Sequence, residues 1–152
     1  MLEVDKVHAL ADAIGPRWRA LVLGAAGLGL RQGEACGLTV DRVDFLRRTV
    51  RIDRQLVTGR EGVAFGPPKT PASDRTIALP STVAEVLAAH LAAYGPGDDG
   101  LIFTTEAGRA IGRNRLADRF RRAAGAAGLE GCDVPRAAPL RGVRAHRLGV
   151  LG

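Results

Sequence analysis

GLGLRQGEACGLTVDRVDF, residues 27–45, is the stretch on which the fold depends. Its glycines end one helix, and a short new helix is expected to begin directly at Arg31. Glu34 follows three residues later and so shares a face of that helix with Arg31. A guanidinium at a helix start can clamp an anionic oxygen pair, but Arg31 and Glu34 could equally form an ordinary surface ion pair.

The sequence on either side of this stretch predicts an α+β fold. Apolar residues recur at helical intervals in several segments, whereas Val50 and Ile52 alternate with polar neighbours as in a strand. Ser81 is expected to cap a helix. We therefore expect a mostly helical domain around a small three-stranded antiparallel sheet. The predicted helices cover residues 4–14, 16–30, 31–38, 81–94 and 113–128. The predicted strands lie within 43–57 and, after a hairpin connection, near 74–79.

Composition narrows the class of protein. The 152 residues contain no apolar run that could cross a bilayer and begin without a signal-peptide pattern, so we expect one cytoplasmic domain without a membrane partner. Cys36 and Cys132 lack metal-ligand spacing, which predicts free thiols and no metal site. The net charge of +6 favours a nucleic-acid partner, although a GC-rich genome produces the same arginine-rich composition without any function.

Lys69 is a second candidate functional residue, because only one other lysine, Lys6, occurs in this arginine-rich chain. A lysine can release a proton near neutral pH and an arginine cannot. From the hairpin tip where we expect it, Lys69 could donate a proton to a leaving oxygen. For this residue alone, a solvated loop lysine is an equally good interpretation.

The two candidates belong to one larger pattern. The first stretch contains L-R-x-G-E and an acidic approach to a strand, with Asp41 and Asp44. Residues 67–80, PPKTPASDRTIALP, contain K-T-x-x-S-x-R-x-hydrophobic-x-L-P. With both motifs in this order, residues 4–131 resemble the catalytic domain of the tyrosine recombinases, the phage-integrase family. Val40 departs from the pattern, since the family often has tryptophan there.

The resemblance implies a function and a set of site residues. In this family a tyrosine hydroxyl attacks a phosphate of double-stranded DNA, leaving a 3′-phosphotyrosine and a free 5′-hydroxyl, without cofactor or metal. Arg31 matches the arginine that clamps the charge of the transition state, and Lys69 matches the residue that protonates the leaving oxygen. Glu34 matches the acid that supports the arginine. The residues expected to bind DNA are Thr70, Arg75, Arg113 and Arg115.

Other catalytic residues of the family are not found in this sequence. The motif H-x-L-R-H should follow the helix that ends near Gly128, and it is absent. The single tyrosine, Tyr94, lies at a predicted helix end, where packing is its expected role. We therefore expect no strand cleavage by this chain, and we do not expect the tetramer on DNA that full-length members form.

The last 21 residues, 132–152, follow neither a helical nor a strand period. We interpret them as an out-of-frame tail behind a partial catalytic domain at 1–131. Codons compatible with the tail, shifted by one base, can encode GATFHALRHYAASALIASGFS, which contains the missing motif. The sequence thus predicts a frameshift between Gly128 and Cys132. Two alternatives stay open: a non-catalytic DNA-binding module, and a decayed fragment without function.

Overall fold

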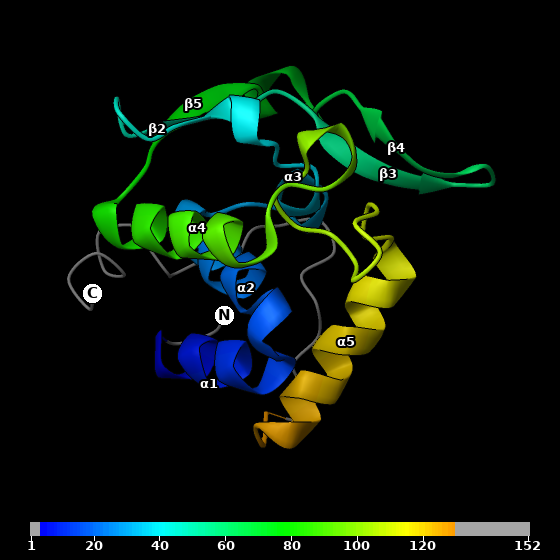
Figure 1. Cartoon of the computed structure of the whole chain (residues 1–152). Coiled ribbons are helices and arrows are strands. Elements are labelled where there is room, and N and C mark those ends of the chain that lie inside the picture. The colour runs from blue at the N-terminus through cyan, green and yellow to red at the C-terminus, as the bar shows by residue number, and fades with distance from the viewer. Residues whose placement is uncertain (1–3, 130–152) are drawn as a thin grey trace.

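The computed structural model describes residues 4–129, so the predicted out-of-frame tail lies outside the described residues. The helices are α1 (Val4–Ile14), α2 (Pro16–Leu28), α3 (Gln32–Cys36), α4 (Ser81–Tyr94) and α5 (Arg113–Ala126). The strands are β1 (Val43–Asp44), β2 (Thr49–Ile52), β3 (Gln55–Gly59), β4 (Gly62–Gly66) and β5 (Arg75–Ala78). The 3-10 turns are η1 (Val40–Arg42), η2 (Pro71–Ser73) and η3 (Asp98–Gly100). The strands lie above a layer of helices, which confirms the α+β prediction (Figure 1).

The helical layer forms around α2. This helix begins with Pro16, whose missing N–H is tolerated in the first turn, and most of its residues are buried. Helix α1 packs against it through one apolar stripe. That stripe consists of Val7, Leu10, Ala11 and Ile14. Helices α4 and α5 close the layer by packing on α2 and α1, respectively, and the core lies between these four helices and the sheet.

The predicted three-stranded antiparallel sheet is confirmed, in the order β1-β2-β5. Strand β2 is central, with Val50 opposite Ile77 of β5 and opposite Val43 of β1. Alternation places Val50 and Ile52 in the core, where they are 0% and 3% exposed, while Arg51 points to solvent.

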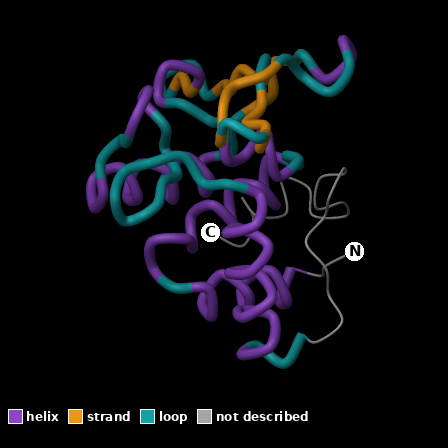
Figure 2. The backbone as a smooth tube through the Cα atoms, turned by 90° about the vertical axis from the view of Figure 1, so that its right-hand side faces the viewer, coloured by secondary structure: helices purple, strands orange, loops and turns teal. Residues whose placement is uncertain are grey.

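The chain leaves this sheet at Asp53 and Arg54, which the strand alternation did not predict. Strands β3 and β4 instead pair only with each other, as a separate two-stranded sheet. This hairpin extends away from the body of the protein (Figure 1), and the strands lie above the helices when seen from the side as well (Figure 2). The region 43–57, in which strands were predicted, thus contributes β1 and β2 to the three-stranded sheet and β3 to the separate hairpin.

Two local predictions were wrong. Lys69 is not at a hairpin tip, because the tip of the β3–β4 hairpin lies between Gly59 and Gly62, and Lys69 lies between β4 and η2. Ser81 is not the cap of α4. The N-cap residue is Pro80, without a side-chain cap hydrogen bond, and Ser81 is the first helical residue.

Within residues 4–129, every helix is too short or too polar to span a membrane.

Candidate active site

Arg31 lies at the junction between two helices. Gly29 ends α2 in the left-handed conformation, with φ of 65°, and its backbone N–H donates to the Ala25 carbonyl. Leu30 is then buried at 2% exposure, and Arg31 is the N-cap residue of α3. This tight reversal explains the glycine before the motif, and it anchors the Arg31 backbone on the core.

The Arg31 side chain reaches the connection between β4 and β5. Its Nη1 atom donates a hydrogen bond of 2.8 Å to the hydroxyl of Ser73, 42 residues away in sequence. The Ser73 hydroxyl also lies 2.9 Å from the hydroxyl of Thr70. Ser73 is 6% exposed, whereas Thr70 is exposed. The two sequence motifs therefore meet through Ser73, which sequence interpretation did not single out although the serine stands in the second motif.

Lys69 is the residue directly before Thr70, so its backbone lies on the same side of the molecule as the Arg31 guanidinium. Its side chain is exposed, and the ammonium has no hydrogen-bond or ion-pair partner among residues 4–129. The structure thus places a solvent-facing cation next to the network that holds Arg31.

Glu34 is a buried carboxylate, 3% exposed, that supports Arg31 differently from the prediction. Its Oε1 atom accepts the backbone N–H of Arg31 at 2.9 Å, which fixes the N-terminus of α3. The same carboxylate accepts two hydrogen bonds from the Arg75 guanidinium, at 2.9 and 3.3 Å. The carboxylate therefore holds the Arg31 main chain and pairs with Arg75.

Arg75 is turned inward by a second contact, because its Nη1 atom also donates to the Ser73 carbonyl at 2.7 Å. Next to it, Asp74 forms an ion pair of 2.5 Å with Arg51 on the neighbouring strand β2. The segment that carries Lys69 and Thr70 is thus tied both to α3 and to the sheet.

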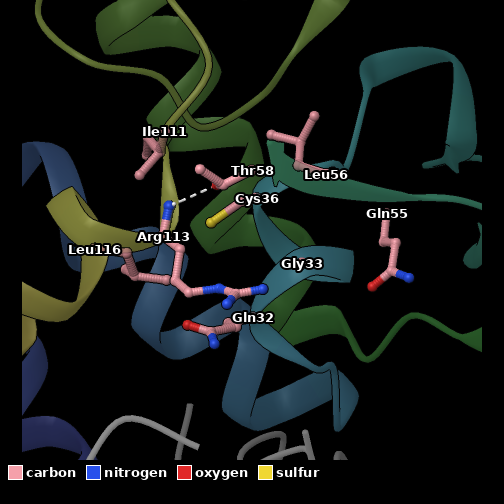
Figure 3. Close-up of a pocket in the computed structure, with 9 residues that line it drawn as sticks. All are labelled: Gln32, Gly33, Cys36, Gln55, Leu56, Thr58, Ile111, Arg113 and Leu116. Atoms are coloured by element: carbon pink, nitrogen blue, oxygen red, sulfur yellow. Dashed lines mark hydrogen bonds between the residues drawn. The ribbon is translucent and has the colours of Figure 1, made fainter. Parts of the chain in front are cut away.

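Arg113 and Arg115 are exposed at the start of α5. The backbone N–H of Arg113 donates to the Thr58 hydroxyl at 3.1 Å, so the β3–β4 hairpin positions this helix start. A cavity of about 70 Å³ separates Arg113 from α3, and the Arg113 side chain extends across it toward Gln32 and Gly33 (Figure 3). Arg113 is therefore brought close to the Arg31 segment, whereas no contact of the Arg115 side chain with residues 4–129 joins it to that network.

Cys36 lines the same cavity, and burial raises the pKa of its thiol to about 12. A thiol with so high a pKa is a poor nucleophile. The described residues 4–129 also contain no group of three His, Cys, Asp or Glu side chains that could hold a metal ion. Arginine, lysine and hydroxyl groups are thus the chemistry that this site offers, and they suit an anion.

Tyr94 takes the packing role that was expected of it. It is the last residue of α4, and the Arg17 guanidinium lies over its ring, 4.9 Å from the centroid. The His90 ring also lies next to the Tyr94 ring, with 5.0 Å between the ring centroids. Tyr94 is therefore part of a cluster on α2 and α4 and does not belong to the Arg31–Ser73 network.

Comparison with known proteins supports the resemblance. The model of the phage integrase family matches residues 1–149. A "Tyrosine recombinase XerC-like" protein of Caldanaerobacter subterraneus subsp. tengcongensis is 29% identical over 147 residues, which cover 82% of this chain and 38% of the relative.

Two solved structures show the same fold. The Tn1549 transposon integrase in complex with a circular intermediate DNA has a TM-score of 0.71 at 20% identity, covering 98% of this chain and 50% of that chain. The XerA recombinase has a TM-score of 0.66 at 20% identity, covering 88% of this chain and 45% of that chain. This chain thus spans half or less of the length of these proteins. With its family match across 149 residues and both motifs assembled in the fold, the chain belongs to the phage integrase family.

Proposed function

We propose that this chain carries one part of the DNA-cleavage site of a site-specific recombinase, in which Arg31 and Lys69 grip one phosphodiester of double-stranded DNA. The observation that supports this best is the hydrogen bond from Arg31 to Ser73, since it joins the two motifs at one place. The relatives point the same way, because the Tn1549 integrase was solved in complex with DNA. DNA as the partner also fits a cytoplasmic protein.

The roles of the two cations follow from their chemistry. A pentacovalent phosphate carries more negative charge than the diester, and a fixed guanidinium stabilises that charge because it needs no reorganisation during the reaction. We assign this role to Arg31, which the core and Ser73 hold in place. Lys69 has an ammonium that can pass a proton to the departing 5′ oxygen, and its solvent exposure leaves it open to DNA.

Further phosphate contacts would orient the duplex on this site. Thr70 offers an exposed hydroxyl beside Lys69, and Arg113 and Arg115 offer exposed guanidinium groups at the start of α5. Such contacts fix the register of a protein on DNA without reading its sequence. We therefore expect sequence-tolerant binding by this chain.

Binding and cleavage are separable in this proposal, because the chain supplies cations but no tyrosine at the site. Four cationic contacts predict that fluorescence-anisotropy titration of duplex DNA shows an affinity loss of about a hundredfold between about 50 and 200 mM salt. A suicide DNA substrate should yield no covalent adduct on a denaturing gel.

Two results would contradict the proposal, one from the titration and one from the cleavage assay. An affinity that does not change with salt would remove the phosphate contacts on which the assignment depends. A covalent adduct would show that this chain cleaves DNA with a nucleophile other than the tyrosine that the family uses.

A further inference from the structure

Arg75 has an environment unlike that of a DNA-contacting arginine. Its guanidinium donates three hydrogen bonds within the protein, two to the Glu34 carboxylate and one to the Ser73 carbonyl. Its side chain is 30% exposed, and its carboxylate partner is 3% exposed. Three of the five guanidinium N–H donors are thus engaged within the protein, and two of the three bind a buried carboxylate.

These contacts close a ring that contains both motifs. The Arg31 backbone N–H donates to Glu34, Glu34 accepts from Arg75, and Arg75 donates to the Ser73 carbonyl. The Ser73 hydroxyl then accepts from the Arg31 guanidinium. The ring therefore holds Arg31 at two points, its main chain through Glu34 and its side chain through Ser73.

We propose that Arg75 and Ser73 are positioning residues for Arg31, and that Arg75 acts through Glu34 and does not bind DNA. The proposal rests on the proposed function, in which Arg31 contacts a phosphate. It replaces the sequence-based expectation that Arg75 itself contacts DNA.

The physical basis is the burial of Glu34. A carboxylate removed from water needs a paired cation, and loss of that cation leaves an uncompensated buried charge. Without Arg75, Glu34 would attract the next available cation, and the Arg31 guanidinium, one helical turn away, would leave Ser73. Loss of the Ser73 hydroxyl would remove the acceptor that joins the Arg31 guanidinium to the second motif, which weakens the hold on the Arg31 side chain.

Neutralising both partners gives the matched test. Arg75→Gln leaves the Glu34 charge unpaired, whereas Glu34→Gln together with Arg75→Gln removes both charges and keeps an amide oxygen for the Arg31 backbone N–H. The positioning role therefore predicts that the single variant loses function and that the double variant recovers it. If Arg75 instead contacts DNA, the single and the double variant should lose function equally.

The first measurement needs no DNA. The ¹⁵N NMR signal of the Arg31 Nε–H group, assigned by its loss in Arg31→Lys, should show restricted motion in the unmodified chain. We expect increased motion in Arg75→Gln and Ser73→Ala, and recovery in the double variant. Ser81→Ala, an exposed serine at the start of α4, is the matched control and should change nothing. Restricted motion retained in Arg75→Gln would overturn the proposal.

The second measurement is affinity for duplex DNA. Arg31→Gln should weaken binding about eightfold at about 0.1 M salt, the loss of one phosphate contact. Arg75→Gln should approach that loss, should add nothing to Arg31→Gln, and should recover to within about twofold of the parent when combined with Glu34→Gln. If the fold-losses in affinity of Arg75→Gln and Arg31→Gln multiply in the combined variant, the proposal is overturned and Arg75 is a DNA ligand.

The two measurements separate the failures. If the chain does not bind DNA, the proposed function fails, and the NMR result still decides whether Arg75 positions Arg31. Thermal melting of each variant shows whether it is folded, and should Arg75→Gln not fold, the comparison of Ser73→Ala with Ser81→Ala decides.

Discussion

Glu34 links the α3 N-terminus to the segment that carries the second motif. The carboxylate is nearly inaccessible to water and meets a main-chain N–H and a guanidinium at the same time. Truncating one partner of a buried ion pair costs about 3–5 kcal/mol, because the other charge is left unpaired. The pair is visible only in three dimensions, since its members are 41 residues apart. The sequence predicted that Glu34 supports the Arg31 guanidinium, whereas the contact that the structure shows is with the Arg31 main-chain N–H.

Cys36 gives a prediction at the residue scale. Burial raises the pKa of its thiol from 9.0 to about 12, which lowers the thiolate fraction near neutral pH about a thousandfold. In a Cys132→Ser background, alkylation by iodoacetamide should therefore be slower by at least that factor in the folded chain than in denaturant. Rapid native-state labelling, followed by mass spectrometry, would show that the helix α3 region opens readily.

His90 predicts how stability depends on pH. Burial lowers the pKa of its imidazole below 6.5, and the ring bonds the Ile102 carbonyl at 3.0 Å. As the pH falls, the unfolded chain therefore takes up a proton at His90 before the folded chain does. The contribution of neutral His90 to the free energy of unfolding is fully present above about pH 7.5 and is lost as the pH falls below 6.5. The melting temperature should decline between about pH 7.5 and 5.5, and less steeply in His90→Gln. His8→Gln is the control, and an identical decline in His90→Gln would contradict the assignment.

At the element scale, the close approach of α3 to β3 depends on two glycines. A Cβ atom at Gly37 would lie 3.0 Å from both the Gly33 carbonyl oxygen and the Leu56 backbone nitrogen. A Cβ at Gly33 would lie 3.0 Å from the Leu56 carbonyl oxygen. Backbone atoms cannot move aside as a side-chain tip can, so both positions need glycine. The glycine of the L-R-x-G-E motif thus serves packing, while its neighbours serve the site.

Alanine substitution tests this packing. Gly37→Ala should lower the free energy of unfolding by about 1–3 kcal/mol, because the added methyl group has no space. Gly125→Ala, in α5 with no atom near the added Cβ, should instead raise it by about 0.5–1 kcal/mol. Urea denaturation measures both. Equal effects at the two positions would mean that α3 can move away from β3.

The bend after β2 marks the limit of prediction from sequence at this scale. Helices α1 and α2 were predicted because their apolar periods are local and strong. The bend is held by side-chain contacts between residues 11 and 15 positions apart: Arg42 donates to Asp53 at 3.0 Å, and Arg54 donates to Thr39 at 2.6 Å. Strand alternation cannot reveal such pairs. The position of Lys69 was missed for the same reason, since a separate hairpin precedes it.

At the scale of the whole molecule, the tail prediction can be tested apart from the fold. A frameshift between Gly128 and Cys132 requires the gene to encode H-x-L-R-H in the shifted frame at this place. Sequencing the DNA across and beyond codon 152 should show it. Codons that cannot give this motif would contradict the frameshift, and the match of the family model to residues 1–149 would then include a genuine in-frame segment.

If Arg31 and Lys69 grip one phosphodiester, removing either cation should change the salt dependence of DNA binding. Arg31→Gln and Lys69→Gln should each reduce the slope of log affinity against log salt by about one. Arg19→Gln, which is paired with Asp12 in the helical layer at 3.1 Å, should leave the slope unchanged. Slopes equal to that of the unmodified chain in both Arg31→Gln and Lys69→Gln would mean that neither residue contacts a phosphate.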